Sequence, residues 1–154
     1  LRCLNEYEIV QEFLKHKEYL RSFRSCNVGT KENIWCNHCS KCLYVYIMLY
    51  PHLTTAEMKQ VFSNEMLDDA SLEEIFKALV LEDVDKPFEC VGEKKEINYS
   101  LQKAVELKKD HLPYLLEKYN KYPHPKVSSE EIEHYFNHQH FIPIEYLKLV
   151  RRRL

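Results

Sequence analysis

Four closely spaced cysteines are the strongest chemical signal in this sequence. Cys26, Cys36, Cys39 and Cys42 follow the pattern C-x9-C-x2-C-x2-C. Thiolates are preferred ligands of tetrahedral zinc, and two-residue spacers let neighbouring sulfurs turn inward on tight turns. Because four thiolates complete the coordination shell, we expect a structural zinc with no open position for water or substrate.

Other uses of the cluster remain open at this point. An iron–sulfur cluster is also held by four cysteines. Disulfides need an oxidising compartment, and no signal-peptide pattern precedes the cluster, so we expect a cytoplasmic protein. A redox pair of Cys36 and Cys39 would use two cysteines and not four. His38 could replace one sulfur, although the four cysteines already suffice.

Composition narrows the class of protein. At 154 residues we expect one domain, and the 45% of apolar residues can form a core. A formal net charge of −2 gives no strong signal for nucleic-acid binding. No uncharged apolar run reaches about eighteen residues, so no membrane segment is expected. Only two glycines occur, Gly29 and Gly92, which argues against a glycine-rich phosphate loop or a dinucleotide fingerprint.

Helical periodicity recurs along the whole chain, without a convincing alternating strand or an internal repeat. We therefore predict a single, compact, all-α multi-helix domain over residues 1–154, with the zinc loop near its N-terminus. The helices are expected at Asn5–Leu20, at 43–50 before Pro51, after the cap pairs Thr54/Glu57 and Ser71/Glu74, at 94–109, from Pro113, from Ser128/Glu131 through Tyr135 and Phe136, and from Pro143.

Two segments carry a resemblance to a known family. One is F-R-S-C at 23–26 followed by W-C-N-H-C-S-K-C at 35–42, and the other is K-P-F-E-C-V-G at 86–92. In this order and separation they resemble the C-terminal half of the UDP-N-acetylmuramoyl-L-alanyl-L-glutamate epimerases. The cysteine segment alone is also similar to the metal loop of 7-cyano-7-deazaguanine synthase, an ATP-pyrophosphatase-type enzyme, and the second segment favours the epimerase. The resemblance covers residues 1–92 well and the rest loosely.

The resemblance implies a bacterial enzyme that uses ATP and magnesium to convert L-glutamate to D-glutamate on a peptidoglycan precursor. Its implied partners are an N-terminal ATP-binding region of the same protein and the UDP-linked muramoyl dipeptide. No S-G-G-x-D-S type loop occurs here, and the chain starts at Leu1. We therefore expect a C-terminal part of a longer protein that is inactive alone. The resemblance itself assigns no catalytic residue.

The K-P-F-E-C-V-G segment has chemistry of its own. Pro87 holds its neighbour extended, and Gly92 permits a tight turn. Lys86 could meet a carboxylate or phosphate, and Glu89 could act as a base at the glutamate α-carbon. The alternative is an ordered loop between helices with Cys90 packed inside. Cys3 is also expected to be a small, buried apolar side chain.

Three functions remain as hypotheses. The first is the C-terminal domain of the epimerase, and the second is the C-terminal part of a deazaguanine-synthase-like ATP pyrophosphatase. The third is a non-catalytic helical zinc module that binds protein or RNA. A phosphate loop upstream in the full-length gene would support either enzyme.

Overall fold

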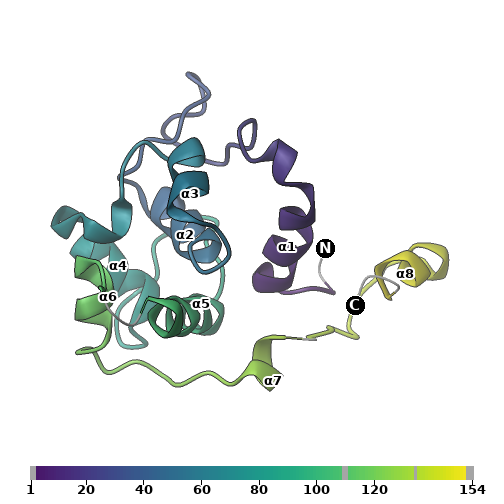
Figure 1. Cartoon of the computed structure of the whole chain (residues 1–154). Helices are drawn as coiled ribbons and strands as arrows, with labels where there is room; N and C mark the ends of the chain where they lie inside the picture. The colour runs from purple at the N-terminus through teal and green to yellow at the C-terminus, as the bar shows by residue number, and fades with distance from the viewer. Residues whose placement is uncertain (1–2, 109–110, 134, 152–154) are drawn as a thin grey trace.

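The computed structural model describes residues 3–108, 111–133 and 135–151, and within these ranges every regular element is helical (Figure 1). The all-α prediction is confirmed for this part of the chain. In the same ranges no helix is long and apolar enough to cross a membrane. The α-helices and 3₁₀ helices (η) are α1 Glu6–Phe13, η1 Leu14–Tyr19, α2 Ser40–Leu49, α3 Thr55–Val61, η2 Met66–Asp68, η3 Ala70–Leu72, α4 Glu73–Val80, α5 Lys94–Leu107, α6 Tyr114–Tyr119, α7 Ser129–Ile132 and α8 Ile144–Arg151.

Helix α2 lies at the centre of the fold. Every residue from Cys42 to Leu49 is buried, as expected for a helix that is apolar on all sides. Helices α1, α4 and α5 all contact it. The expected buried helix after the cysteines is therefore confirmed, and its first turn carries the last of those cysteines.

Buried polar side chains on α5 bind it to three neighbouring helices. The Ser100 hydroxyl donates to the carbonyl of Ile47 in α2 at 2.9 Å. The Asn98 side-chain amide donates to the carbonyl of Val80 in α4 at 3.0 Å, and the backbone carbonyl of Asn98 accepts from the Tyr119 hydroxyl of α6 at 3.1 Å. Since buried polar groups are costly without partners, these bonds fix the orientation of α5.

Three of the four predicted cap pairs form capping boxes: Asn5/Glu8, Thr54/Glu57 and Ser128/Glu131. The prediction for Ser71 and Glu74 is wrong. The Asp69 carboxylate accepts from the Ser71 amide at 2.9 Å and from its hydroxyl at 2.7 Å. This local Asx turn gives the short helix η3, and α4 begins after it at Glu73.

Two predicted helices are shorter than expected. The first ends as an α-helix at Phe13, and η1 follows with a kink at His16, whose φ is −123° and ψ is 53°. Helix α7 ends at Ile132 because Glu133 adopts an extended backbone, so Tyr135 and Phe136 lie beyond it. The chain then runs to α8, which lies apart from the helices around α2 (Figure 1).

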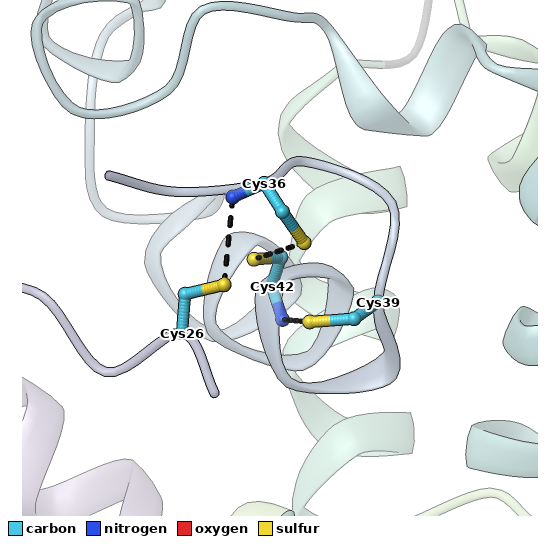
Figure 2. Close-up of side chains that lie close together, drawn as sticks. All are labelled: Cys26, Cys36, Cys39 and Cys42. Carbon is cyan, nitrogen blue, oxygen red and sulfur yellow. Dashed lines mark hydrogen bonds between the residues drawn. The ribbon is translucent and has the colours of Figure 1, made fainter. Parts of the chain in front are cut away.

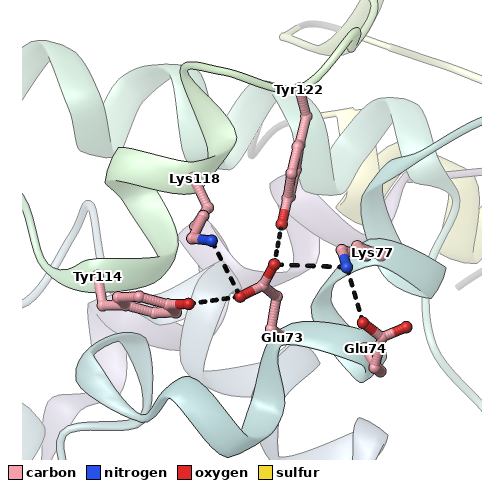
Figure 3. A network of polar contacts seen from close by, with 6 residues as sticks. All are labelled: Glu73, Glu74, Lys77, Tyr114, Lys118 and Tyr122. Atoms are coloured by element: carbon pink, nitrogen blue, oxygen red, sulfur yellow. Dashed lines mark hydrogen bonds and ion pairs between the residues drawn. The ribbon is translucent and has the colours of Figure 1, made fainter.

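A polar network around Glu73 joins α4 to α6 and to the segment after it (Figure 3). The Glu73 carboxylate accepts from the hydroxyls of Tyr114 at 2.5 Å and Tyr122 at 2.6 Å. The ammonium groups of Lys77 and Lys118 each lie 3.4 Å from it. The two tyrosine hydroxyls, followed by the lysines, lower the pKa of Glu73 from 4.5 to about 2.

We predict that Glu73→Gln lowers the melting temperature at neutral pH because the ionised carboxylate is lost. Since the pKa of folded Glu73 lies below its unfolded value, its contribution is complete above about pH 4.5 and disappears as the pH falls toward about 2. The difference between variant and wild type should therefore shrink over that range in thermal melts. Glu74→Gln, on the same helix but exposed, is the control. Equal effects of both variants at every pH would contradict the prediction.

Candidate metal centre and adjoining cleft

The fold brings all four predicted ligand sulfurs together. The sulfurs of Cys26, Cys36, Cys39 and Cys42 lie within 4.8 Å of one another, and those of Cys36 and Cys42 are 3.6 Å apart. Figure 2 shows the four side chains converging from the loop and from the start of α2. With Zn–S bonds of about 2.3 Å, a tetrahedron has sulfur–sulfur edges of about 3.8 Å. The donor set and its spacing therefore fit a tetrahedral thiophilic metal.

The start of α2 positions two of the ligands. Cys39 is the N-cap residue, and its sulfur accepts from the amide of Cys42 at 3.4 Å. Asn37 adopts a left-handed φ of 59°, which turns the chain between Cys36 and Cys39. The Asn37 amide donates to the Trp35 carbonyl at 2.9 Å, so the turn is itself held in place.

Backbone amides from the loop bind the sulfur of Cys26. The Gly29 amide donates to it at 3.1 Å and the Cys36 amide at 3.5 Å. A Cβ atom at Gly29 would lie 2.3 Å from the Ile34 carbonyl oxygen, so only glycine fits this turn. Gly29 is a supporting residue that sequence reasoning missed, although its place within the cysteine cluster was a usable signal.

The thiol groups of Cys26, Cys39 and Cys42 differ in pKa. Burial alone would raise the pKa of Cys26, but the Gly29 and Cys36 amides, with the neighbouring thiols, lower it to about 6. Burial raises the pKa of Cys39 to about 11 and that of Cys42 still further. Four thiolates so close together, two of them buried, are therefore costly without a counter-charge, and a divalent cation would supply it.

Aromatic side chains pack around Trp35, which directly precedes Cys36 in the loop. The ring of buried Trp35 lies 5.5 Å from that of Phe23 and 5.0 Å from that of Phe62. Phe23 in turn contacts Phe13 at the end of α1. His38 is exposed, and its Nδ1 lies 2.6 Å from the Cys36 carbonyl oxygen, so it does not join the group of ligand sulfurs.

The K-P-F-E-C-V-G segment docks onto the same helix start. The Glu89 carboxylate accepts from the Ser40 hydroxyl at 2.7 Å and from the Lys41 amide at 2.9 Å. The Lys41 ammonium also contacts the carbonyl of Cys90. The expectation of a packed Cys90 is wrong, because its side chain is exposed and only its backbone is engaged. The buried position expected for Cys3 is confirmed.

A polar cleft of about 330 Å³ lies beside this segment, between the starts of α1 and α5. Lys86 and Gly92 contribute to it from the segment, and Glu6, Glu93 and Glu96 contribute from the helices. The structure thus places one of the two predicted catalytic candidates, Lys86, at the cleft. The other, Glu89, lies at the first turn of α2 and is not among the residues that line it.

Glu96 lines the cleft and Tyr44 contacts its lining, and the sequence analysis singled out neither residue. Glu96 is 4% exposed, and its carboxylate accepts from the backbone amides of Glu6 at 3.2 Å and Glu93 at 3.0 Å. Burial raises its pKa, and the two amides oppose that shift. The Tyr44 hydroxyl donates to Glu6 at 3.4 Å, and a Cβ atom at Gly92 would lie 2.7 Å from it. The sequence predicted a helix over 94–109, and its apolar periodicity gave no sign of a cleft at its start.

Comparisons with known proteins agree with the resemblance drawn from the two motifs. The profile of the MurL C-terminal domain family matches residues 21–133. A protein of Xanthomonas oryzae pv. oryzae is 35% identical over 102 residues, covering 62% of this chain and 23% of the relative. One of Salinispora tropica is 34% identical over 100 residues, covering 62% and 22%. One of a Micromonospora species is 31% identical over 110 residues, covering 69% and 25%.

All three relatives are named UDP-N-acetyl-alpha-D-muramoyl-L-alanyl-L-glutamate epimerase. The chain spans about a quarter of the length of these curated relatives. No solved structure gives a significant match.

We predict that the purified chain contains about one equivalent of zinc. Cys39→Ser should reduce the zinc content and markedly lower the melting temperature, because metal binding adds several kcal/mol to folding, on the order seen for other structural zinc sites. Cys90→Ser, which alters an exposed thiol, is the matched control and should retain both. A folded, metal-free protein whose four cluster thiols react freely would contradict the prediction.

We also predict that Glu89→Ala lowers the free energy of unfolding by about 1 kcal/mol, because two donors in the first turn of α2 lose their acceptor. Glu89→Gln should cost less, since an amide oxygen can still accept. Denaturant titration of both variants measures this, with Glu82→Ala at an exposed site as the control. If Glu89→Ala is as stable as the control, the capping role is wrong.

Proposed function

The chain belongs to the MurL C-terminal domain family, and we propose that it forms the zinc-stabilised C-terminal domain of an ATP-dependent epimerase. The substrate of that enzyme would be UDP-N-acetylmuramoyl-L-alanyl-L-glutamate, whose terminal L-glutamate it inverts during peptidoglycan synthesis. The family match carries this proposal, and the names of the three relatives support the reaction. The four converging sulfurs support the zinc.

In the proposed reaction the terminal glutamate is activated by adenylation. The α-carboxylate displaces pyrophosphate from ATP, and the resulting acyl-adenylate makes the α-proton more acidic. After a base removes that proton and a proton returns to the opposite face, hydrolysis of the acyl-adenylate gives the D-isomer and AMP. ATP and magnesium would bind to the N-terminal region of the full-length protein, and this domain would provide part of the substrate site. The zinc would cross-link the loop to α2, since four thiolates leave no position for substrate.

Two carboxyl groups are candidates for proton transfer at the α-carbon. A role for Glu89 as the base stays a prediction from the sequence. Its two hydrogen bonds to the start of α2 favour a positioning role. Glu96 lies in the cleft, and its raised pKa is a property that proton-transferring carboxyl groups commonly have. Substituting each one separately in the full-length enzyme would distinguish them.

The N-terminal ATP-binding region is the proposed partner of this domain. The relatives are about four times as long as the region matched here, so most of each lies outside this domain. Apolar side chains that stand fully in solvent, such as Phe88 and Phe141, are suited to contact it. We place the enzyme in the cytoplasm, where thiols stay reduced and available to a metal.

We predict that the full-length protein, supplied with magnesium, ATP and the UDP-linked dipeptide, releases AMP and forms D-glutamate, whereas the isolated chain does neither. Chiral analysis of the hydrolysed product and an AMP assay measure both results. Activity on a deazaguanine acid in place of the dipeptide would instead identify an ATP pyrophosphatase. Absence of both activities would favour a non-catalytic zinc module.

A further inference from the structure

Lys86 differs from the other lysine at the cleft. The Lys95 ammonium pairs with the Glu93 carboxylate at 3.2 Å. The Lys86 ammonium contacts only the carbonyl oxygens of Val91 and Gly92, both at a long 3.4 Å. Within the described ranges no carboxylate forms a salt bridge with it. It is therefore a cation at the cleft that can still bind an anion.

The carboxylates of the cleft are satisfied to different degrees. Both oxygens of Glu96 accept from backbone amides, and Glu93 is neutralised by Lys95. Glu6 is exposed and accepts one long bond from Tyr44 at 3.4 Å, which leaves acceptor capacity for a ligand N–H. A suitable ligand thus carries a carboxylate for Lys86 and an amide N–H for Glu6.

An amino acid linked through its nitrogen, with an acidic side chain, meets both requirements. A terminal N-acylglutamate offers one amide N–H and two carboxylates. In the proposed reaction adenylation neutralises the α-carboxylate, so a single lysine suffices for the side-chain carboxylate that remains. The volume of about 330 Å³ accommodates such a group but not the whole nucleotide-linked precursor.

The backbone holds Lys86 in place for this task. Glu89 fixes the middle of the segment to the first turn of α2. At its end, Gly92 packs so closely against Tyr44 and Glu96 that a Cβ atom would lie 2.7 Å and 2.8 Å from their oxygens. A lysine on a segment fixed at both points starts from a defined backbone position, so binding has to order only its side chain.

We propose that this cleft binds the terminal N-acylglutamate of the substrate and that Lys86 binds its side-chain carboxylate. This inference rests on the proposed function and adds the group that selects glutamate over neutral amino acids. Glu6 accepts the amide N–H of the same residue.

The test uses the full-length protein with the UDP-linked dipeptide. Lys86→Met should raise KM by about 10- to 100-fold, the range for losing a charge-assisted hydrogen bond, with kcat changed far less. Lys86→Arg should restore much of the affinity. Lys15→Met, at an exposed site outside the cleft, is the control. Unchanged melting temperature and zinc content would confirm that each variant is folded.

An analogue ending in L-glutamine, which lacks the side-chain carboxylate, distinguishes loss of the lysine–carboxylate contact from general damage to the protein. Wild type should bind it weakly, and Lys86→Met should bind both ligands equally weakly. If wild type epimerises the dipeptide and Lys86→Met keeps its KM, the inference is overturned and the proposed function stands. If wild type does not epimerise, the proposed function fails. Calorimetric titration with N-acetyl-L-glutamate then decides: binding that Lys86→Met abolishes supports the site, and no binding to wild type overturns it.

Discussion

The first turn of α2 is the point on which the rest of the structure depends. A helix N-terminus exposes amides without partners, and here sulfur and carboxylate ligands occupy them. The Cys39 sulfur accepts from the Cys42 amide, and Glu89 accepts from the Lys41 amide and from the Ser40 hydroxyl. The same helix is buried from Cys42 to Leu49, so the cysteine loop, the core and the K-P-F-E-C-V-G segment meet at its first turn.

This arrangement connects the cysteine cluster to the cleft through a short covalent path. Cys42 faces the other sulfurs, while Tyr44, two residues later on α2, faces Glu6 and Gly92 at the cleft. Glu89 adds a second connection by holding the segment that carries Lys86. A metal closed off by four thiolates can therefore influence the chemistry through position alone.

The parts of the structure that sequence patterns predicted are those set by local spacing. The buried helix and the Asn5/Glu8 cap depend on neighbours within a few residues, and the whole cysteine cluster lies within the short stretch 26–42. The Ser71/Glu74 cap failed because Asp69, two residues upstream, offered a competing local partner. Glu96 was missed for a different reason: its contact with Glu6 joins positions 90 residues apart, and no local pattern encodes that distance.

The two glycines of the chain lie at two close contacts, one in the cysteine loop and one beside the cleft. In a chain so poor in glycine, both occur where a Cβ atom would collide with a neighbour, Gly29 with the Ile34 carbonyl and Gly92 with Tyr44. Gly29 also donates its amide to the Cys26 sulfur. One glycine therefore allows the loop to close around the sulfurs, and the other allows the segment to close against α2. The fold therefore needs one glycine in the cysteine loop and the other at the cleft, each at a position that a larger residue would not fit.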